Sequence, residues 1–97
     1  MREEWAAEWE MLRPMIVESP ADVLPDLADL VGRMLAARGH PVDASDPAAA
    51  GDDLSTQYVQ ARAAADAAAV GEARTADVGD AIAQLRELYE VLAREAR

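Results

Sequence analysis

The chain contains no cysteine and only one histidine, His40, among its 97 residues. Without cysteine there can be no disulfide, no thiolate metal ligand and no cysteine nucleophile. A zinc site needs three or four ligands, usually histidine or cysteine, and a dinuclear site in a helical bundle needs Glu-x-x-His motifs, which the sequence lacks. We therefore expect no metal and no cofactor. We interpret His40 as a residue at the end of a helix, facing the negative end of its dipole.

Motifs of catalysis are missing as well. The serines at positions 19, 45 and 55 have a single histidine to share as a base, and no nucleophile-elbow motif surrounds them. The sequence has no glycine-rich phosphate loop and no dinucleotide-binding fingerprint. We therefore expect no enzyme. General acid–base chemistry by a carboxylate pair, or a weak site built from His40, Asp43 and Asp46, stays open as the less favoured alternative.

Lysine and asparagine are absent too. Nine arginines stand against 19 acidic residues, so the formal net charge is −10. Such a surface repels the phosphates of nucleic acids and of anionic membranes, and it favours solubility or attraction to a basic partner. No apolar run approaches the ~20 residues of a membrane span, and residues 1–4 offer no apolar leader core. We therefore expect a cytoplasmic protein that binds neither nucleic acid nor membranes.

Phenylalanine is absent, and aromatic residues of all kinds make up 4% of the chain. Alanine is abundant; it has the highest helix propensity but buries little area per residue. Apolar residues recur at helical spacing in four segments, at about residues 3–18, 20–38, 53–70 and 76–96, and there is no strand pattern. The sequence predicts one all-α domain over residues 1–97. We expect an antiparallel helical bundle of three long helices plus a kinked N-terminal helix.

Proline, glycine and serine mark the expected helix boundaries. Pro14 lies inside the first segment and predicts a kink or break near residues 10–13. Ser19 followed by Pro20 predicts a capped start for the second segment, and Gly39 predicts its left-handed end. The stretch 40–53 reads as a loop, with a helical turn allowed after Asp46-Pro47.

The two tryptophans, Trp5 and Trp9, lie four residues apart on one apolar stripe of the first segment. Both rings can pack on the bundle and fill space that the alanines leave. Alternatively, one or both anchor a partner or a second copy of the chain, because tryptophan is enriched at interface hot spots. Trp9 lies in the middle of the stripe and favours the core. Trp5 lies closer to the chain end and is the better candidate for an interaction residue.

Three aspartates, Asp22, Asp26 and Asp29, share one face of the second predicted helix. At this spacing they could bind a hard cation or a basic partner. The simpler interpretation is a solvated face on which Asp29 pairs with Arg33. We keep the three aspartates, with the two tryptophans, as candidate protein-interaction residues.

Two stretches of the chain carry recognisable patterns, W-x-x-L-x-x-x-I-V-E-x-P from Trp9 to Pro20 and T-x-D-V-x-x-A-I-x-x-L-R-x-L-Y-x-x-L from Thr75 to Leu92. Both resemble a family of small acidic helical proteins from actinobacteria. The middle of the chain, "GHPVDASDPAAAGDD", and the prolines at 14 and 25 depart from the family pattern. The resemblance implies a shared helical fold, and the family has no assigned enzyme activity or cofactor to carry over to this chain.

Together these features predict a non-catalytic helical protein-interaction module, a small cytoplasmic regulator or adaptor. Its expected partner is another protein or a second copy of itself. The alternative is an acidic mimic, an anti-sigma-type regulator that occupies a basic protein surface. A metal-binding protein or an enzyme is the least favoured of the three.

Overall fold

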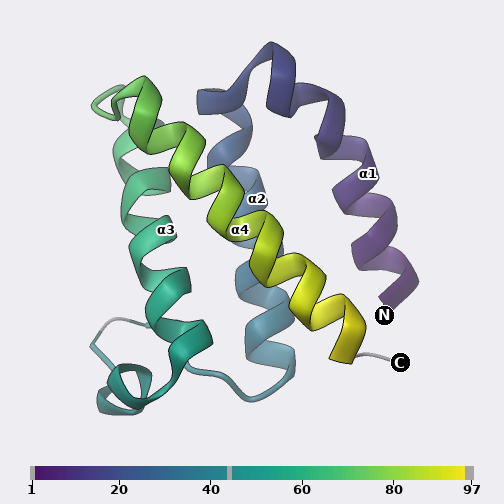
Figure 1. The fold of residues 1–97 in the computed structure, drawn as a ribbon, viewed down its shortest axis with the longest axis vertical. Helices are drawn as coiled ribbons and strands as arrows, with labels where there is room; N and C mark the ends of the chain where they lie inside the picture. The colour runs from purple at the N-terminus through teal and green to yellow at the C-terminus, as the bar shows by residue number, and fades with distance from the viewer. Residues whose placement is uncertain (1, 44, 96–97) are drawn as a thin grey trace.

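The computed structural model describes residues 2–43 and 45–95 of the chain (Figure 1). The described residues form four α-helices and one 3-10 turn, with no strand: α1 (Arg2–Glu18), α2 (Pro20–Ala37), η1 (Pro47–Gly51), α3 (Asp53–Ala69) and α4 (Thr75–Glu95). The predicted all-α fold is confirmed. The predicted ends at residues 38 and 70 differ by one, because Arg38 and Val70 are the C-cap residues of α2 and α3. The predicted end at residue 96 lies outside the described residues.

Consecutive helices alternate in direction, so that the chain runs up α1, down α2, up α3 and down α4 (Figure 1). Helices α2, α3 and α4 pack against one another, whereas α1 packs mainly on α2. The molecule measures 31 × 30 × 16 Å along its principal axes. Since one helix with its side chains is ~10–12 Å wide, this thin slab leaves every helix with a face in solvent.

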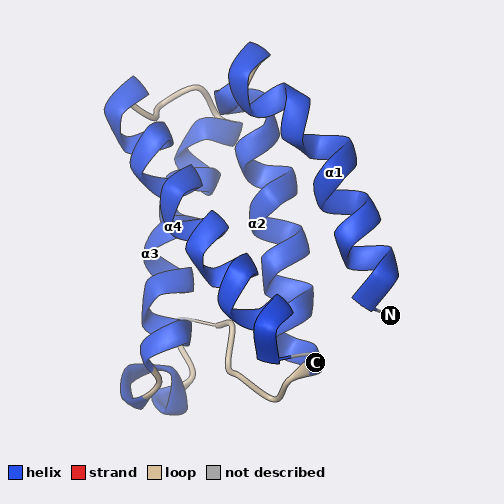
Figure 2. Cartoon of the chain, turned by 45° about the vertical axis from the view of Figure 1, so that its right-hand side comes forward, coloured by secondary structure: helices blue, strands red, loops and turns tan. Residues whose placement is uncertain are grey.

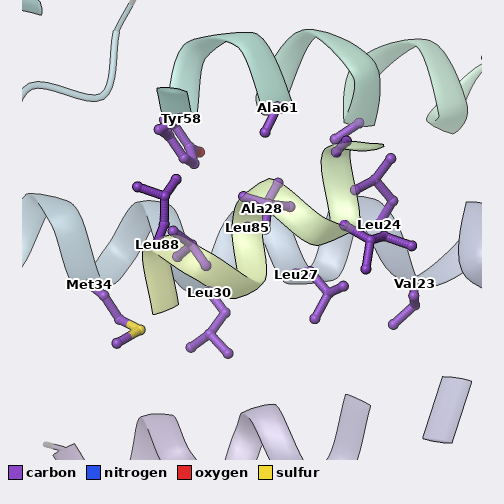
Figure 3. Packing of buried hydrophobic residues seen from close by; sticks show 14 of the residues in the cluster. Val23, Leu24, Leu27, Ala28, Leu30, Met34, Tyr58, Ala61, Leu85 and Leu88 are labelled. Atoms are coloured by element: carbon purple, nitrogen blue, oxygen red, sulfur yellow. The ribbon is translucent and has the colours of Figure 1, made fainter. Parts of the chain in front are cut away.

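Helix α2 is the centre of the core. It contributes nine buried residues, and α1, α3 and α4 all contact it. In Figure 3, Val23, Leu30 and Met34 point from α2 towards the ribbon of α1. Tyr58 and Ala61 point inwards from α3, on the opposite side (Figure 3). The apolar stripe of α2 is wide because three neighbours share it, and this burial of aliphatic side chains is the main stabilising contribution to the fold.

Helix α3 has a thin buried face made of Ser55, Tyr58, Ala61 and Ala65. The small alanines let α3 approach α2 closely. Tyr58 lies against Gly32 of α2, where an added Cβ would stand 2.5 Å from the Tyr58 hydroxyl oxygen. Burial raises the pKa of the Tyr58 phenol above its ordinary value. Gly32 is therefore required for space at this contact.

Ser19 alone joins α1 to α2. Its N–H donates to the Met15 carbonyl at 2.7 Å, and its own carbonyl accepts from the N–H groups of Asp22 and Val23. The expected side-chain cap is wrong, because Ser19 has φ −145° and ψ 63°, and its hydroxyl makes no capping hydrogen bond.

Pro14 does not break α1, which is helical from Arg2 to Glu18. Figures 1 and 2 show the axis of α1 turning towards α2 in its second half. The expected break is therefore wrong, and the expected kink takes the form of this bend. Proline causes it by removing one backbone hydrogen bond and crowding the preceding turn.

Glycines end α2 and α3. Gly39 has φ 82° and Gly71 has φ 75°. In both places the N–H of the next residue reaches back to the helix: His40 N donates to Leu35 O at 3.0 Å, and Glu72 N donates to Ala67 O at 2.8 Å. These are Schellman-type endings, and the left-handed Gly39 confirms the predicted end of the second helix.

Candidate functional site

Trp9 and Tyr89 hold α1 against α4. Trp9 is 6% exposed and belongs to the core cluster. Its ring stacks on that of Tyr89, with 4.3 Å between centroids and 8° between planes. Trp9 therefore packs in the core of the isolated chain, as its place in the stripe indicates. The sequence did not pair it with Tyr89, although both residues lie on the apolar stripes of their helices.

A cleft of about 390 Å³ lies between α1 and α4 beside this stack. Trp9, Tyr89 and Ile16 supply its aromatic and apolar surface. Charged residues of both helices line it as well: Glu10, Arg13, Arg86 and Glu90. Burial, and to a smaller extent the charge of Glu10, raises the pKa of the Tyr89 phenol above its ordinary value. The cleft has charges of both signs and suits a partly apolar segment better than a small ion.

Trp5 lies one turn nearer the start of α1. It is partly buried and packs against the core cluster, as Leu12 and Ile16 do. Its ring is thus less enclosed than that of Trp9. Trp5 therefore stays a candidate interaction residue, since the chain itself covers its ring only in part.

Helix α1 also exposes large apolar side chains that the sequence analysis did not single out. Met11 is 77% exposed and Val17 is 85% exposed, and Met15 is partly exposed. Met11 and Met15 are one helical turn apart and share a face. Val17 follows Glu10 and Arg13 of the cleft at helical spacing, so it continues that side of α1. Exposed apolar residues gathered on one element often mark a contact surface.

The aspartates of α2 are all exposed, but they do not act as one cluster. The Asp29 carboxylate accepts a hydrogen bond from Arg62 of α3 at 2.5 Å, and Arg62 also pairs with Asp66 at 3.1 Å. Asp22 and Asp26 make no ion pair within the described residues. On this face Asp22 and Asp26 are therefore unpaired within the described residues, whereas Asp29 is neutralised by Arg62.

The expected pairing of Asp29 with Arg33 is wrong. Arg33 instead forms an ion pair with Glu8 of α1, and only its Nε approaches the Asp29 backbone oxygen, at 3.4 Å. Helical spacing alone favours an i, i+4 pair, but the neighbouring helices supply competing charges on both sides. Arg62 and Glu8 belong to other helices, and a single sequence gives no signal for such contacts.

His40 contacts the cap of α3 and lies next to no cluster of metal ligands. Its Nδ1 lies 2.7 Å from Oδ2 of Asp52, whose Oδ1 accepts the Ser55 N–H at 3.1 Å. The His40 contact, followed by the Ser55 N–H, lowers the pKa of the Asp52 carboxyl below its ordinary value. Over residues 2–43 and 45–95, no group of three or more His, Asp or Glu side chains is placed to hold a metal ion.

The loop before α3 contains the helical turn that the sequence allowed. Asp46 caps η1, since its carboxylate accepts the Ala48 N–H at 2.9 Å. Asp43 accepts both the N–H and the hydroxyl of Ser45, and these bonds lower the pKa of the Asp43 carboxyl. The loop carboxylates are thus engaged in local caps and turns.

In the part of the chain that the structure describes, no helix is both long enough and apolar enough to cross a bilayer. No known family model, curated protein or solved structure matches the chain. The resemblance to the actinobacterial family therefore stays a prediction.

Proposed function

We propose that this protein is a non-catalytic protein-interaction module, a small cytoplasmic regulator or adaptor that uses α1 to bind a second copy or another protein. The supporting observation is that α1 exposes large apolar side chains: Val17 on the side of the cleft of Trp9 and Tyr89, and Met11 and Met15 on a separate face. Covering apolar surface is the main driving force of association. Trp5 is the aromatic residue best placed to contribute to the contact.

Sedimentation velocity tests self-association. We expect the wild-type chain to sediment as a dimer at ~100 µM, and Met11→Gln with Val17→Gln to shift it towards the monomer. Val70→Gln is the control, because Val70 is 68% exposed but lies at the end of α3. A wild-type monomer at this concentration contradicts self-association.

Binding to another protein through α1 is tested by cross-linking in the native cell. The wild-type and Val70→Gln chains should capture the same partner, and the Met11→Gln, Val17→Gln chain should lose it. Equal capture by all three chains contradicts a contact through α1.

A second function, as an acidic regulator of the anti-sigma type that occupies a basic protein surface, is supported by the unpaired carboxylates. Asp22 and Asp26 are exposed and carry no ion pair in the described chain, and the net charge is −10. Affinity for a basic partner should then fall steeply between about 0.05 and 0.5 M salt, because exposed charges are screened over ~10 Å at 0.1 M. Affinity that does not change with salt contradicts this function.

A further inference from the structure

A groove of about 380 Å³ opens between α3 and α4. Figure 1 shows α4 diverging from α3 beyond the turn that joins them. Six alanines supply its apolar surface: Ala61, Ala63, Ala64, Ala67, Ala73 and Ala81. Because the apolar part of the groove consists of methyl groups, the backbone of another helix can come close to α3 and α4 there.

Three carboxylates line the same groove, those of Glu72, Asp77 and Asp80, and no arginine does. None of the three makes a side-chain ion pair within the described residues. Elsewhere several acidic side chains are engaged: Glu8 and Asp29 pair with arginines of neighbouring helices. The groove therefore combines an apolar surface with negative charge that no cation of the described chain neutralises.

We propose that the α3–α4 groove binds a basic α-helix of a partner protein, one with a stripe of small apolar residues flanked by lysine or arginine. The groove follows α3 from Gln60 to Ala67, about two helical turns or ~10 Å, so two turns of the partner helix fill it. Because the groove is negatively charged, charge complementarity favours a partner helix with positive charge. A second copy of this chain offers no basic helix to the groove, because it carries the same excess of acid, and phosphate backbones and anionic lipids are excluded from the groove by their negative charge.

This inference rests on the acidic-regulator function proposed above and gives that function a site. Its test uses two synthetic 18-residue peptides of identical Ala, Leu and Lys composition. In the first peptide the lysines flank one apolar stripe of a helix, and in the second they are spread over all faces. Fluorescence anisotropy of the labelled peptides measures binding. Amide chemical shifts of the labelled protein locate the contact.

The decisive variant is Glu72→Gln with Asp80→Asn. Its matched control is Glu4→Gln with Glu18→Gln, which removes two negative charges from α1, outside the groove. All four positions are exposed, so both variants should keep the helical circular dichroism and the melting temperature of the wild type. We expect the first peptide to bind more tightly than the second. The groove variant should bind it at least about threefold more weakly than the control variant, because charge pairs at an interface rim are individually modest.

Four outcomes overturn the groove as the site. Equal weakening by the two variants shows that net charge alone attracts the peptide, which leaves the acidic-regulator function standing. Equal affinity for the two peptides, or shifts confined to α1 and the aspartate face of α2, also leaves that function without this groove. No binding of either peptide at ~1 mM in low salt overturns both the groove and the acidic-regulator function.

Discussion

His40 Nδ1 lies 2.7 Å from Oδ2 of Asp52, and this contact joins the end of α2 to the start of α3. His40 directly follows the left-handed Gly39, and Asp52 is the N-cap residue of α3. Asp52 therefore has two roles. Its Oδ1 caps α3 by accepting the Ser55 N–H, and its Oδ2 contacts His40 at the start of the loop. The 11 residues between the two are closed at their base by this side-chain pair.

This pair predicts a dependence of stability on pH. The His40 contact and the Ser55 N–H lower the pKa of Asp52, so the folded chain binds this proton more weakly than the unfolded chain does. The stabilisation is therefore present above the unfolded pKa of ~3.9 and is lost as pH falls through the lower, folded pKa. The melting temperature of Asp52→Asn should lie below that of the wild type at pH 6, and the two should converge near pH 2.

Asp52→Ala tests the capping hydrogen bond of Asp52 separately from its negative charge. Asparagine is also a good N-cap residue, so Asp52→Asn keeps the hydrogen bond to Ser55, whereas alanine removes it. Asp52→Ala should therefore melt below Asp52→Asn at pH 6 and stay below it at pH 2. Identical melting of the two variants would contradict a capping role for Asp52.

Trp9→Ala should lower the free energy of unfolding by about 3–5 kcal/mol, because it empties a buried aromatic site between α1 and α4. Trp5→Ala should cost less, since Trp5 is only partly buried, and it should weaken association more than folding. Urea unfolding followed by circular dichroism measures the loss of stability in both variants, and sedimentation velocity measures the weakening of association. A double-mutant cycle with Tyr89→Ala should give a coupling of about 0.5–1.5 kcal/mol for the stacked rings.

Gly32→Ala should destabilise the fold by about 1–3 kcal/mol through overpacking, since its methyl group would stand 2.5 Å from the Tyr58 hydroxyl oxygen. Tyr58→Phe removes that oxygen and should restore part of the loss in the double variant. Gly79→Ala is the control, because a Cβ there meets nothing within 4 Å inside α4. It should stabilise the fold by about 0.5–1 kcal/mol. Thermal unfolding of the four variants gives the comparison.

Arg62→Gln should cost less than about 1 kcal/mol at low salt, although Arg62 bridges Asp29 and Asp66. The pairs are partly exposed, with 36% of the Arg62 side chain and 58% of the Asp29 side chain accessible, so solvent weakens them. The loss of stability in Arg62→Gln should be smaller still in ~0.5 M salt, because salt screens the ion pairs. Arg74→Gln serves as the control, because Arg74 has no ion pair in the described chain.

The sequence predicted those features that depend on neighbours along the chain. The apolar stripe of α2, the helical turn after Asp46 and the left-handed Gly39 all follow from local spacing and from the conformational range of particular residues. Ser19 was the exception among the caps, since the sharp turn sets its backbone outside the conformation that a capping side chain needs.

Contacts between helices could not be predicted in the same way. The stacking of Trp9 on Tyr89 depends on the angle at which α1 returns across the bundle, which a single periodic pattern does not encode. The pairing of Asp29 with Arg62, and the contact of His40 with Asp52, likewise depend on which helix faces lie side by side. The groove between α3 and α4 was not predicted, because it depends on how α4 diverges from α3 (Figure 1).

The closeness of Trp9 and Tyr89 provides an intrinsic fluorescence signal for the packing of α1 on α4. With ring centroids 4.3 Å apart and the planes almost parallel, light absorbed by Tyr89 passes to Trp9 before the tyrosine can emit. Fluorescence from Tyr89 should therefore be quenched while α1 lies on α4, and it should return when α1 moves away. The position of this helix can be followed in the native chain without a label.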